Sequence, residues 1–414
     1  MIDGRSTVRR KNVLKPDTGK PVWALGTMTG TSMDGLDLAL LRTDGETIFG
    51  FGPSWEVPLW PELSRQLRHA LPEIAKLETT DLRDPGNWPD WLRELQYRIT
   101  RHHGWAIEGF QLDEGLETSG MDSRWDWMKR NEQPTPIGVH GQTVLHRPED
   151  RFTLQLLDPR IMPTGFVHSE IVSDFRSADM EAGGQGAPLA PFYHFALARH
   201  IGAAEPLVFL NIGGVANITW IDPRKDLPEE PGALIAFDTG PGNALVNDWM
   251  GQTTGAAMDR DGKAASAGTV HLDRLGTNSG QAYLDRRPPK SLDRNDFHGV
   301  LGAMAGLSAE DGAATLTAFT AECVAASLKH MPAPPARWLV CGGGRLNATM
   351  MRMLQDRLEA PVEPVEAVGL DGDMLEAQAF AYLAVRVLRG LPTSAPSTTG
   401  CREPVCGGRI SYPS

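Results

Sequence analysis

The sequence predicts an α/β protein of two lobes, with mixed sheets flanked by helices, and three observations support this. The chain has 414 residues, more than one ordinary hydrophobic core needs, so two lobes are expected. Short apolar runs typical of strands alternate with stretches of helical periodicity. The segments 22–41 and 207–221 each consist of two apolar runs joined by a glycine-containing turn. One such hairpin early in each half is what a duplicated, two-lobed nucleotide-binding protein would contain.

The first lobe is expected over residues 22–200, after a basic leader, 1–21, that we interpret as disordered. An amphipathic helix is expected at 61–77, where apolar residues recur at helical spacing. The polar stretch 111–134 has no clear periodicity, which indicates an inserted surface loop. The remaining expected elements are a helix at 91–99, strands at 137–140, 153–157 and 171–175, and a helix at 188–200.

The second lobe is expected over residues 201–400, and residues 401–414 form a tail. Strands and helices continue to alternate after the second hairpin. The final helix could cross back to the first lobe. The expected elements are strands at 233–237 and 338–341 and helices at 243–250, 314–330, 345–358 and 373–389.

Charge and composition limit the classes of partner. The formal net charge is -12, from 40 basic and 52 acidic residues, and an acidic chain repels a phosphate backbone, so no nucleic-acid partner is expected. No apolar run reaches the roughly 20 residues of a membrane helix, and no apolar segment follows the basic N-terminus as in a secretory signal. Cys401 and Cys406 could form a disulfide or half a metal site, but a reduced, cytoplasmic protein fits the cysteine content better.

The first hairpin turn is rich in glycine, hydroxyl and carboxylate residues. Glycines let backbone N–H groups approach an anion, Thr and Ser add donors, and Asp34 or Asp37 could hold Mg²⁺ through water. We interpret the turn as a phosphate loop, although not of the Walker A type, because no Gly-Lys-Ser/Thr occurs and no helix follows. The candidate ATP-binding residues here are Gly30, Thr31, Ser32, Met33, Asp34, Gly35, Leu36 and Asp37.

Two glycine turns in the second half are further candidates for nucleotide binding. The Gly-Gly turn of the second hairpin would alone be an ordinary turn, but paired with the first loop it is a candidate second phosphate loop. Three glycines after the strand 338–341 let a flat ring approach the backbone, so an adenine or ribose site is expected, with a tight strand-to-helix turn as the alternative. The candidate residues are Asn211, Gly213, Gly214, Gly342, Gly343, Gly344 and Asn347.

Asp238 directly follows the strand 233–237, at the kind of strand end where ligands bind in α/β sheets. A carboxylate there, flanked by glycines, is well placed as a general base. The structural alternative is that Asp238 caps the turn that follows. Gly240 and Asn243, in the same polar run, are candidate substrate-binding residues.

Two polar groups at predicted strand ends in the first half suit hydrogen bonding to a sugar. Neither has metal-ligand spacing, and the neighbouring His146 is interpreted as structural. No CxxC pair, HExxH or GxSxG pattern occurs, so zinc and serine hydrolases lack support. The candidate substrate-binding residues are His140, Gln142, Thr143, Asp174, Arg176 and Asp179.

Eight motifs between about residue 22 and residue 400 resemble, in order, those of the anhydro-N-acetylmuramic acid kinases. The motifs are GTMTGTSMDGLD, HGQTVLHRP, DFRSADMEAGGQGAPL, NIGGVANIT, FDTGPGN, PPKSLDRNDF, CGGGRLN and DGDMLEAQAFAYLA. The resemblance implies an actin/hexokinase-like (ribonuclease H-like) ATPase clamp that uses ATP and Mg²⁺. It also implies an amino-sugar substrate from cell-wall turnover, a homodimer and a cytoplasmic location.

The resemblance further implies the reaction. Water opens the 1,6-anhydro ring of 1,6-anhydro-N-acetylmuramic acid, and O6 takes the γ-phosphoryl group to give N-acetylmuramic acid 6-phosphate and ADP. By motif, Asp238 matches the family's base and Glu376 a second carboxylate near the same water, although sequence alone would read Glu376 as an ordinary helix residue. The chain departs from the family pattern at the leader, at 111–134, at the loop 222–231 and at Asp293, where glycine is expected. The departure at Asp293 bears on the fine shape of the sugar pocket rather than on the reaction class.

Two other functions remain open. An ordinary sugar kinase of the same fold would phosphorylate a free hydroxyl group of a reducing sugar. A non-catalytic ATP clamp would bind ATP and close without sugar turnover, but it would need neither Asp238 nor the sugar-side motifs. Release of ADP with an anhydro sugar or with a reducing sugar distinguishes these readings.

Overall fold

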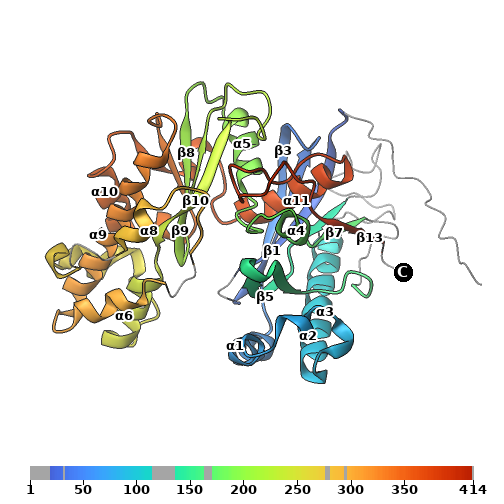
Figure 1. Ribbon diagram of the computed structural model, residues 1–414, viewed down its shortest axis with the longest axis horizontal. Coiled ribbons are helices and arrows are strands. Elements are labelled where there is room, and N and C mark those ends of the chain that lie inside the picture. The colour runs from blue at the N-terminus through green and yellow to red at the C-terminus, as the bar shows by residue number, and fades with distance from the viewer. Residues whose placement is uncertain are drawn as a thin grey trace, which may run out of the picture.

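The computed structural model describes residues 19–30, 33–113, 136–162, 170–275, 280–292 and 296–412. Two sheets lie side by side, each with helices packed against it (Figure 1). Residues 1–18 of the predicted leader, almost all of the predicted insertion at 111–134, Thr31, Ser32 and Asp293 lie outside the described residues. No helix in these ranges is both long and apolar enough to cross a membrane.

The first sheet consists of β1 (Val22–Thr29), β2 (Gly35–Thr43), β3 (Ile48–Pro58), β4 (Ile137–Val139), β7 (Ile171–Ser173) and β13 (Arg409–Ser411). The strands lie in the order β13-β7-β4-β1-β2-β3. β1, β2 and β3 run antiparallel, and β4 and then β7 lie parallel beside β1. The predicted first hairpin is thus the centre of this sheet.

The second sheet consists of β8 (Leu207–Ile212), β9 (Val215–Ile221), β10 (Leu234–Pro241), β11 (Trp338–Cys341) and β12 (Val362–Pro364). Its order is β10-β9-β8-β11-β12, again three consecutive antiparallel strands followed by two parallel ones. The two sheets therefore repeat one topology. This confirms the α/β fold class with mixed sheets, and the repeat is the one expected of a duplicated clamp. A separate ribbon joins β5 (Gln142–Arg147) to β6 (Phe152–Leu156).

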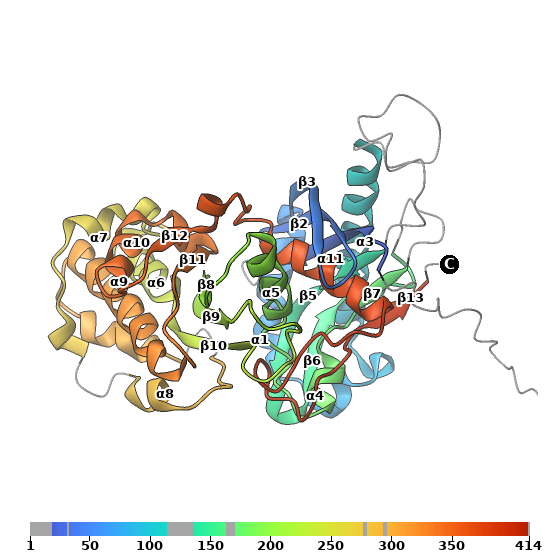
Figure 2. The same ribbon diagram turned by 90° about the horizontal axis from the view of Figure 1, so that it is seen from above.

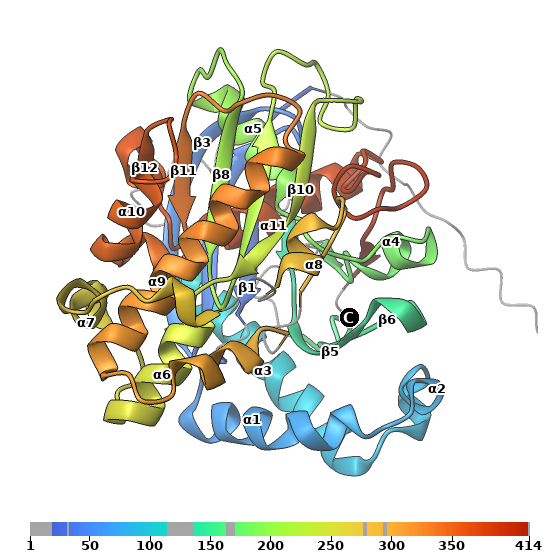
Figure 3. The same cartoon turned by 60° about the vertical axis from the view of Figure 1, so that its left-hand side comes forward.

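Helices cover both sheets, and most begin or end close to where periodicity predicts. The helix expected at 91–99 continues to residue 113, because Ala106, Ile107 and Phe110 extend its buried face onto the first sheet. The α-helices are α1 (Pro61–Ala75), α2 (Thr79–Leu82), α3 (Asp90–Asp113), α4 (Ser177–Glu181), α5 (Pro191–His200), α6 (Ala244–Thr254), α7 (Lys263–Ala267), α8 (Gln281–Asp285), α9 (Ala309–Ala326), α10 (Ala348–Gln355) and α11 (Leu375–Leu388). Figure 3 shows α9 lying across the second sheet, where it packs with α10 on one face.

Two helices, α5 and α11, lie between the sheets and share one core with both of them (Figure 2). This core joins Ala24 and Leu41 of the first sheet to Phe209 and Leu339 of the second through apolar residues of α5 and α11. A helix that is apolar on all sides is the kind that lies buried between layers. α11 has this character, since nearly all of its residues are buried.

α11 approaches the first sheet closely because glycines face it. A Cβ atom added at Gly26 of β1 would overlap the carbonyl oxygen of Ala377, and one added at Gly138 of β4 would overlap that of Phe380. Both clashes are with helix backbone, which cannot rotate away. These glycines fix how the final helix sits on the first sheet.

The end of the chain also lies on the first sheet. β13 pairs antiparallel with β7, so the sequence-defined tail supplies an edge strand. β13 and the glycine-facing side of α11 thus pack on the first sheet, which is the return that the sequence analysis left open for the final helix. The division at residue 200 stays a prediction.

Candidate active site

The two glycine turns around Asp238 meet at one end of the second sheet. The backbone N–H of Gly242 donates to the carbonyl oxygen of Gly214 at 2.9 Å, and that of Asn243 donates to the oxygen of Gly213 at 2.8 Å. A side chain at Gly242 would overlap Gly213. The predicted phosphate loop and the loop after Asp238 therefore form one packed unit.

The triple-glycine turn lies against the same unit. Gly342 has φ +69, and a Cβ atom there would overlap the side chain of Asn211, while one at Gly344 would overlap Ile212. No atom within 4 Å would obstruct a Cβ at Gly343. Asn347 is set apart from this group, because its Oδ1 accepts the N–H of Met350 and caps α10.

Asp238 is half-buried near the carboxyl end of β10. Its Oδ2 accepts the backbone N–H of Leu292 at 2.7 Å, and the Tyr283 hydroxyl donates to its carbonyl oxygen at 2.7 Å. Burial raises the pKa of this carboxyl to about 7, against the Leu292 hydrogen bond and the positive charge of Lys290. The carboxyl can therefore take up and release a proton near neutral pH.

The segment that holds Asp238 belongs to the Pro-Pro-Lys-Ser-Leu motif, whose role the sequence left unassigned. Lys290 is buried, at 3% exposed, and its carbonyl oxygen accepts the N–H of Asp238 at 3.0 Å. No periodicity or spacing signals this pairing, because the two residues lie 52 positions apart, with several helices between them. The only local feature that marks this segment in the sequence is the pair of prolines directly before Lys290.

Glu376 lies in the first turn of α11, with a side chain that is exposed at the surface. The protein around its carboxyl still removes part of the hydration and raises its pKa, whereas the positive charge of Arg176 lowers it. Its charge also raises the pKa of Asp37 on β2 and of Cys341 on β11. The two predicted catalytic carboxylates thus come from different halves, Asp238 from the second sheet and Glu376 from the helix on the first.

Several carboxylates gather around Asp37. Burial is the main reason that the pKa of Asp37 rises to about 7, and the charges of Glu56, Glu376 and Asp34 add to it. Within the described ranges, no three His, Cys, Asp or Glu side chains are grouped so as to hold a metal ion by themselves. An ion here would need ligands from a bound molecule or from water.

The first hairpin turn is supported by the His140 loop. The Gln142 amide donates to the carbonyl oxygen of Gly30 at 3.3 Å, and the Thr29 hydroxyl donates to that of Gly141 at 3.1 Å. Met33 has φ 55 and is buried, so it turns the chain into β2. Of the predicted loop residues, Asp34 is exposed, Gly35 and Leu36 belong to β2, and Leu36 faces the core.

The buried His140 and the half-buried Arg176 form a polar pair at the ends of β4 and β7. Arg176 donates through Nε at 3.2 Å and Nη2 at 2.7 Å to His140 Nε2, and through Nη1 at 2.7 Å to the carbonyl oxygen of Gly186. Burial and the guanidinium charge hold the pKa of His140 well below its usual value, so the imidazole is neutral. Burial also lowers the pKa of Arg176 to about 10, although it stays protonated.

The other three sugar-side candidates have internal partners. Asp174 accepts the Ser177 hydroxyl at 2.6 Å and pairs with Arg409 at 3.0 Å. The Thr143 hydroxyl accepts the amide of Gln155 at 3.2 Å. Asp179 accepts from Ser394 Oγ at 2.5 Å, Thr399 Oγ1 at 2.6 Å and Gly186 N at 2.7 Å. Asp179 therefore ties residues 394–399 to the segment that follows β7.

We expect Asp179→Ala to loosen the end of the chain. Three donors lose a charged acceptor in a buried place, which costs about 2–4 kcal/mol. Hydrogen exchange of residues 392–412 should become faster, and the midpoint of urea unfolding should fall. Glu181→Ala, an exposed carboxylate on the same helix, is the control and should change neither. Unchanged exchange in the Asp179 variant would contradict this structural role.

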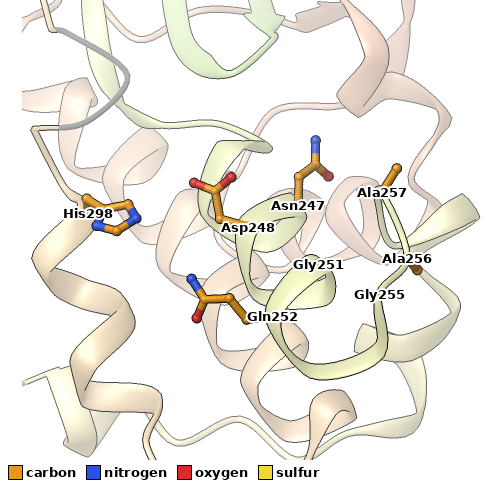
Figure 4. Close-up of a pocket in the computed structure, with 8 residues that line it drawn as sticks. All are labelled: Asn247, Asp248, Gly251, Gln252, Gly255, Ala256, Ala257 and His298. Atoms are coloured by element: carbon orange, nitrogen blue, oxygen red, sulfur yellow. The ribbon is translucent and has the colours of Figure 1, made fainter. Parts of the chain in front are cut away.

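Two hollows lie near these groups. A cavity of about 480 Å³ is bounded by His140, Ser173, Asp174 and the residues of β6. A second hollow, of about 730 Å³, lies along α6 and begins one turn beyond Asn243. Figure 4 shows Asp248 and Gln252 on α6 with His298 across from them. Gly240, a predicted substrate-binding residue, is buried and packs against Cys323 instead of lining either hollow.

Comparisons with known proteins agree on one family. The family described as "Anhydro-N-acetylmuramic acid kinase" matches residues 113–413. The protein of that name from Ruegeria sp. (strain TM1040) is 47% identical over 393 residues, covering 95% of this chain and 96% of its own length. "Anhydro-N-acetylmuramic acid kinase 1" from Jannaschia sp. (strain CCS1) is 48% identical over 393 residues, with 95% and 96% covered. A solved ROK family glucokinase from Streptomyces griseus, in complex with glucose and AMPPNP, is 13% identical with a TM-score of 0.37, covering 87% of this chain and 99% of that chain. The chain belongs to the anhydro-N-acetylmuramic acid kinase family.

Proposed function

We propose that this kinase opens 1,6-anhydro-N-acetylmuramic acid with water and phosphorylates O6 from ATP, giving N-acetylmuramic acid 6-phosphate and ADP. The observation that supports the proposal best is the placing of Asp238. Burial raises the pKa of its carboxyl to about 7, and the chain that follows it, at Gly242 and Asn243, packs on the glycine turn at 213–214. Peptidoglycan recycling is the pathway that would supply this sugar.

Asp238 is the proposed base for the water. As water attacks C1 of the sugar, its proton goes to the Asp238 carboxylate, and the C1–O6 bond breaks with its electron pair left on O6. O6 then attacks the γ-phosphorus of ATP, and the bond to the β-phosphate oxygen breaks to release ADP. The atoms balance with one water consumed, and no free phosphate forms.

Backbone N–H groups of the glycine turns at 30–35 and 211–214 are proposed to bind the phosphates. Such donors are fixed before reaction and stabilise the charge that develops on the transferred group. The turn 342–344 is proposed to receive the adenosine, because Gly343 leaves the backbone unobstructed. Gln142 Oε1 is buried and has no hydrogen-bond partner among the described residues, so it is a proposed acceptor for a sugar hydroxyl.

Asp34 and Asp37 are the proposed residues for Mg²⁺, bound mainly through the ATP phosphates and water. The mutual repulsion of carboxylates around Asp37 is relieved by a divalent cation, and hard oxygen donors suit this ion. When bound, Mg²⁺ would neutralise charge on the phosphates. Glu376 is the proposed second carboxylate, held beside Arg176. A homodimer and a cytoplasmic location stay predictions.

The test is release of ADP from ATP and Mg²⁺ with three additions in parallel. These are 1,6-anhydro-N-acetylmuramic acid, N-acetylmuramic acid and buffer alone. We expect release only with the anhydro sugar. Release with the reducing sugar alone would favour an ordinary sugar kinase, and ATP binding without release would favour a non-catalytic clamp.

The pH dependence of kcat/KM should follow Asp238. Because burial raises its pKa to about 7, the carboxyl is neutral below this pH and cannot accept a proton. We expect kcat/KM to rise through about pH 7 and to fall about tenfold per unit below it. Asp37 has a similar pKa, so the profile of Asp37→Asn serves as the control and should keep the inflection. A profile flat from pH 5.5 to 8 would contradict the assignment.

A further inference from the structure

Lys290 is an uncommon kind of lysine. Its side chain is almost fully buried, and no carboxylate within the described ranges forms an ion pair with it. Its ammonium donates to the carbonyl oxygens of Tyr283 at 3.0 Å and Leu284 at 3.2 Å. A buried charge without an ion-pair partner is costly, and a methionine of similar length would avoid that cost. The position therefore needs an explanation beyond packing.

Two aromatic rings line the place where the ammonium lies. The nitrogen is 4.6 Å from the centre of the Tyr283 ring and 5.5 Å from that of Phe237. These contacts partly compensate the lost hydration. Phe237 directly precedes Asp238, and the Tyr283 hydroxyl donates to the Asp238 carbonyl oxygen. Tyr283 thus contacts both the Lys290 ammonium and the backbone of the candidate base, and Phe237 is the chain neighbour of that base.

The backbone completes this arrangement. Lys290 accepts the N–H of Asp238, and two residues later the N–H of Leu292 donates to the Asp238 carboxylate. The segment 283–292 therefore fixes Asp238 at its N–H, its carbonyl oxygen and its side chain. It also brings one positive charge near that carboxylate without a direct ion pair, which would hold the carboxylate too acidic to act as a base.

We propose that Lys290 is a positioning residue, which holds the candidate base Asp238 through the backbone and places one buried positive charge near it. This deepens the proposed function and rests on it. The charge opposes the effect of burial on Asp238, and the carbonyl contacts keep the ammonium from closing onto the carboxylate. Lys290 itself touches neither water nor sugar in this role.

Several other charged groups surround Lys290, but they affect the pKa of Lys290 or of Tyr283 rather than that of Asp238. The pKa of Lys290 is lowered to about 8, mainly by burial and also by the charges of Lys329 and Arg286, whereas Asp285 and Cys323 oppose the change. The charge of Asp296 raises the pKa of Tyr283. His330, in the turn that follows α9, packs against Phe237 and donates to the carbonyl oxygen of Leu284. Among these groups, Lys290 alone is a cationic contributor to the pKa of Asp238.

The experiment compares pH profiles of kcat/KM for Lys290→Gln, Lys290→Met and Lys290→Arg with the wild type. Gln can still donate to the two carbonyl oxygens but has no charge, so it tests charge even if the methionine variant does not fold. We expect both neutral variants to move the acidic inflection upward by about one pH unit, and the arginine variant to move it less. Lys263→Met, an exposed lysine on α7, is the matched control and should leave the profile unchanged.

The inference is overturned if folded Lys290→Gln keeps the wild-type inflection, or if it loses activity equally at every pH. Its failure is separate from failure of the proposed function. If the wild type does not release ADP with the anhydro sugar, or if Asp238→Asn remains active, the proposed function fails first. If both of those hold and the inflection does not move, only the role of Lys290 is wrong.

Discussion

Asp238→Asn is expected to lower sugar-dependent ADP release by about 10²–10⁴-fold, the range that one general base contributes. The amide cannot take a proton from water, but its oxygen still accepts the Leu292 N–H that now holds the carboxylate. The variant should therefore fold and bind ATP like the wild type. Release is measured with saturating ATP and anhydro sugar, and ATP binding by calorimetry.

A matched control comes from the same sheet. Asp222 follows β9, pairs with Arg224 and lies away from the glycine turns. Asp222→Asn should keep wild-type turnover. Turnover of Asp238→Asn within tenfold of the wild type would show that another group activates the water.

Gly26→Ala is expected to have the largest effect on stability. The new methyl group would overlap the Ala377 carbonyl and the Ala381 N–H of α11, so the helix must move away from the sheet. Overpacking of this kind costs about 3 kcal/mol or more where backbone cannot yield. The shift also carries Glu376, in the first turn of α11, away from Arg176. The urea midpoint and turnover should therefore fall together.

Gly50→Ala is the control for that substitution. Gly50 lies on β3 of the same sheet, and a Cβ atom there meets nothing within 4 Å. It should leave stability unchanged or raise it slightly, because alanine restricts the unfolded chain. A wild-type midpoint for Gly26→Ala would mean that α11 does not pack on β1 as the structure shows.

Local patterns in the sequence predicted most of the elements. The two hairpins form the centres of the two sheets. The glycine turns at 211–214 and 342–344, which the sequence named as separate candidates for nucleotide binding, lie against each other. Strand alternation and helical spacing depend on neighbours in the chain, so they survive in any tertiary context. The helix α3 was underestimated because two histidines, His102 and His103, interrupt its apolar face although both are buried.

Contacts between distant segments could not be predicted in the same way. The pairing of β13 with β7 joins residues more than 200 positions apart, and neither strand has a local signal for its partner. Likewise, nothing in the sequence indicated that Asp179, a candidate substrate-binding residue, accepts hydrogen bonds from Ser394 and Thr399 near the end of the chain. Lys290 was missed because its contact with Asp238 is a backbone hydrogen bond across 52 positions, which sequence spacing does not reveal.

The most direct test of the central claim is the fate of water oxygen during turnover. The enzyme reacts briefly with ATP and the anhydro sugar in ¹⁸O-enriched water. Borohydride then reduces the sugar product, which stops exchange of its C1 oxygen with water, and the masses of the products are determined by mass spectrometry. If water activated by Asp238 opens the ring, one ¹⁸O is found at C1 of the sugar and none in its phosphate. Label in free inorganic phosphate, with an unlabelled sugar, would show that water attacks ATP instead and would contradict the account.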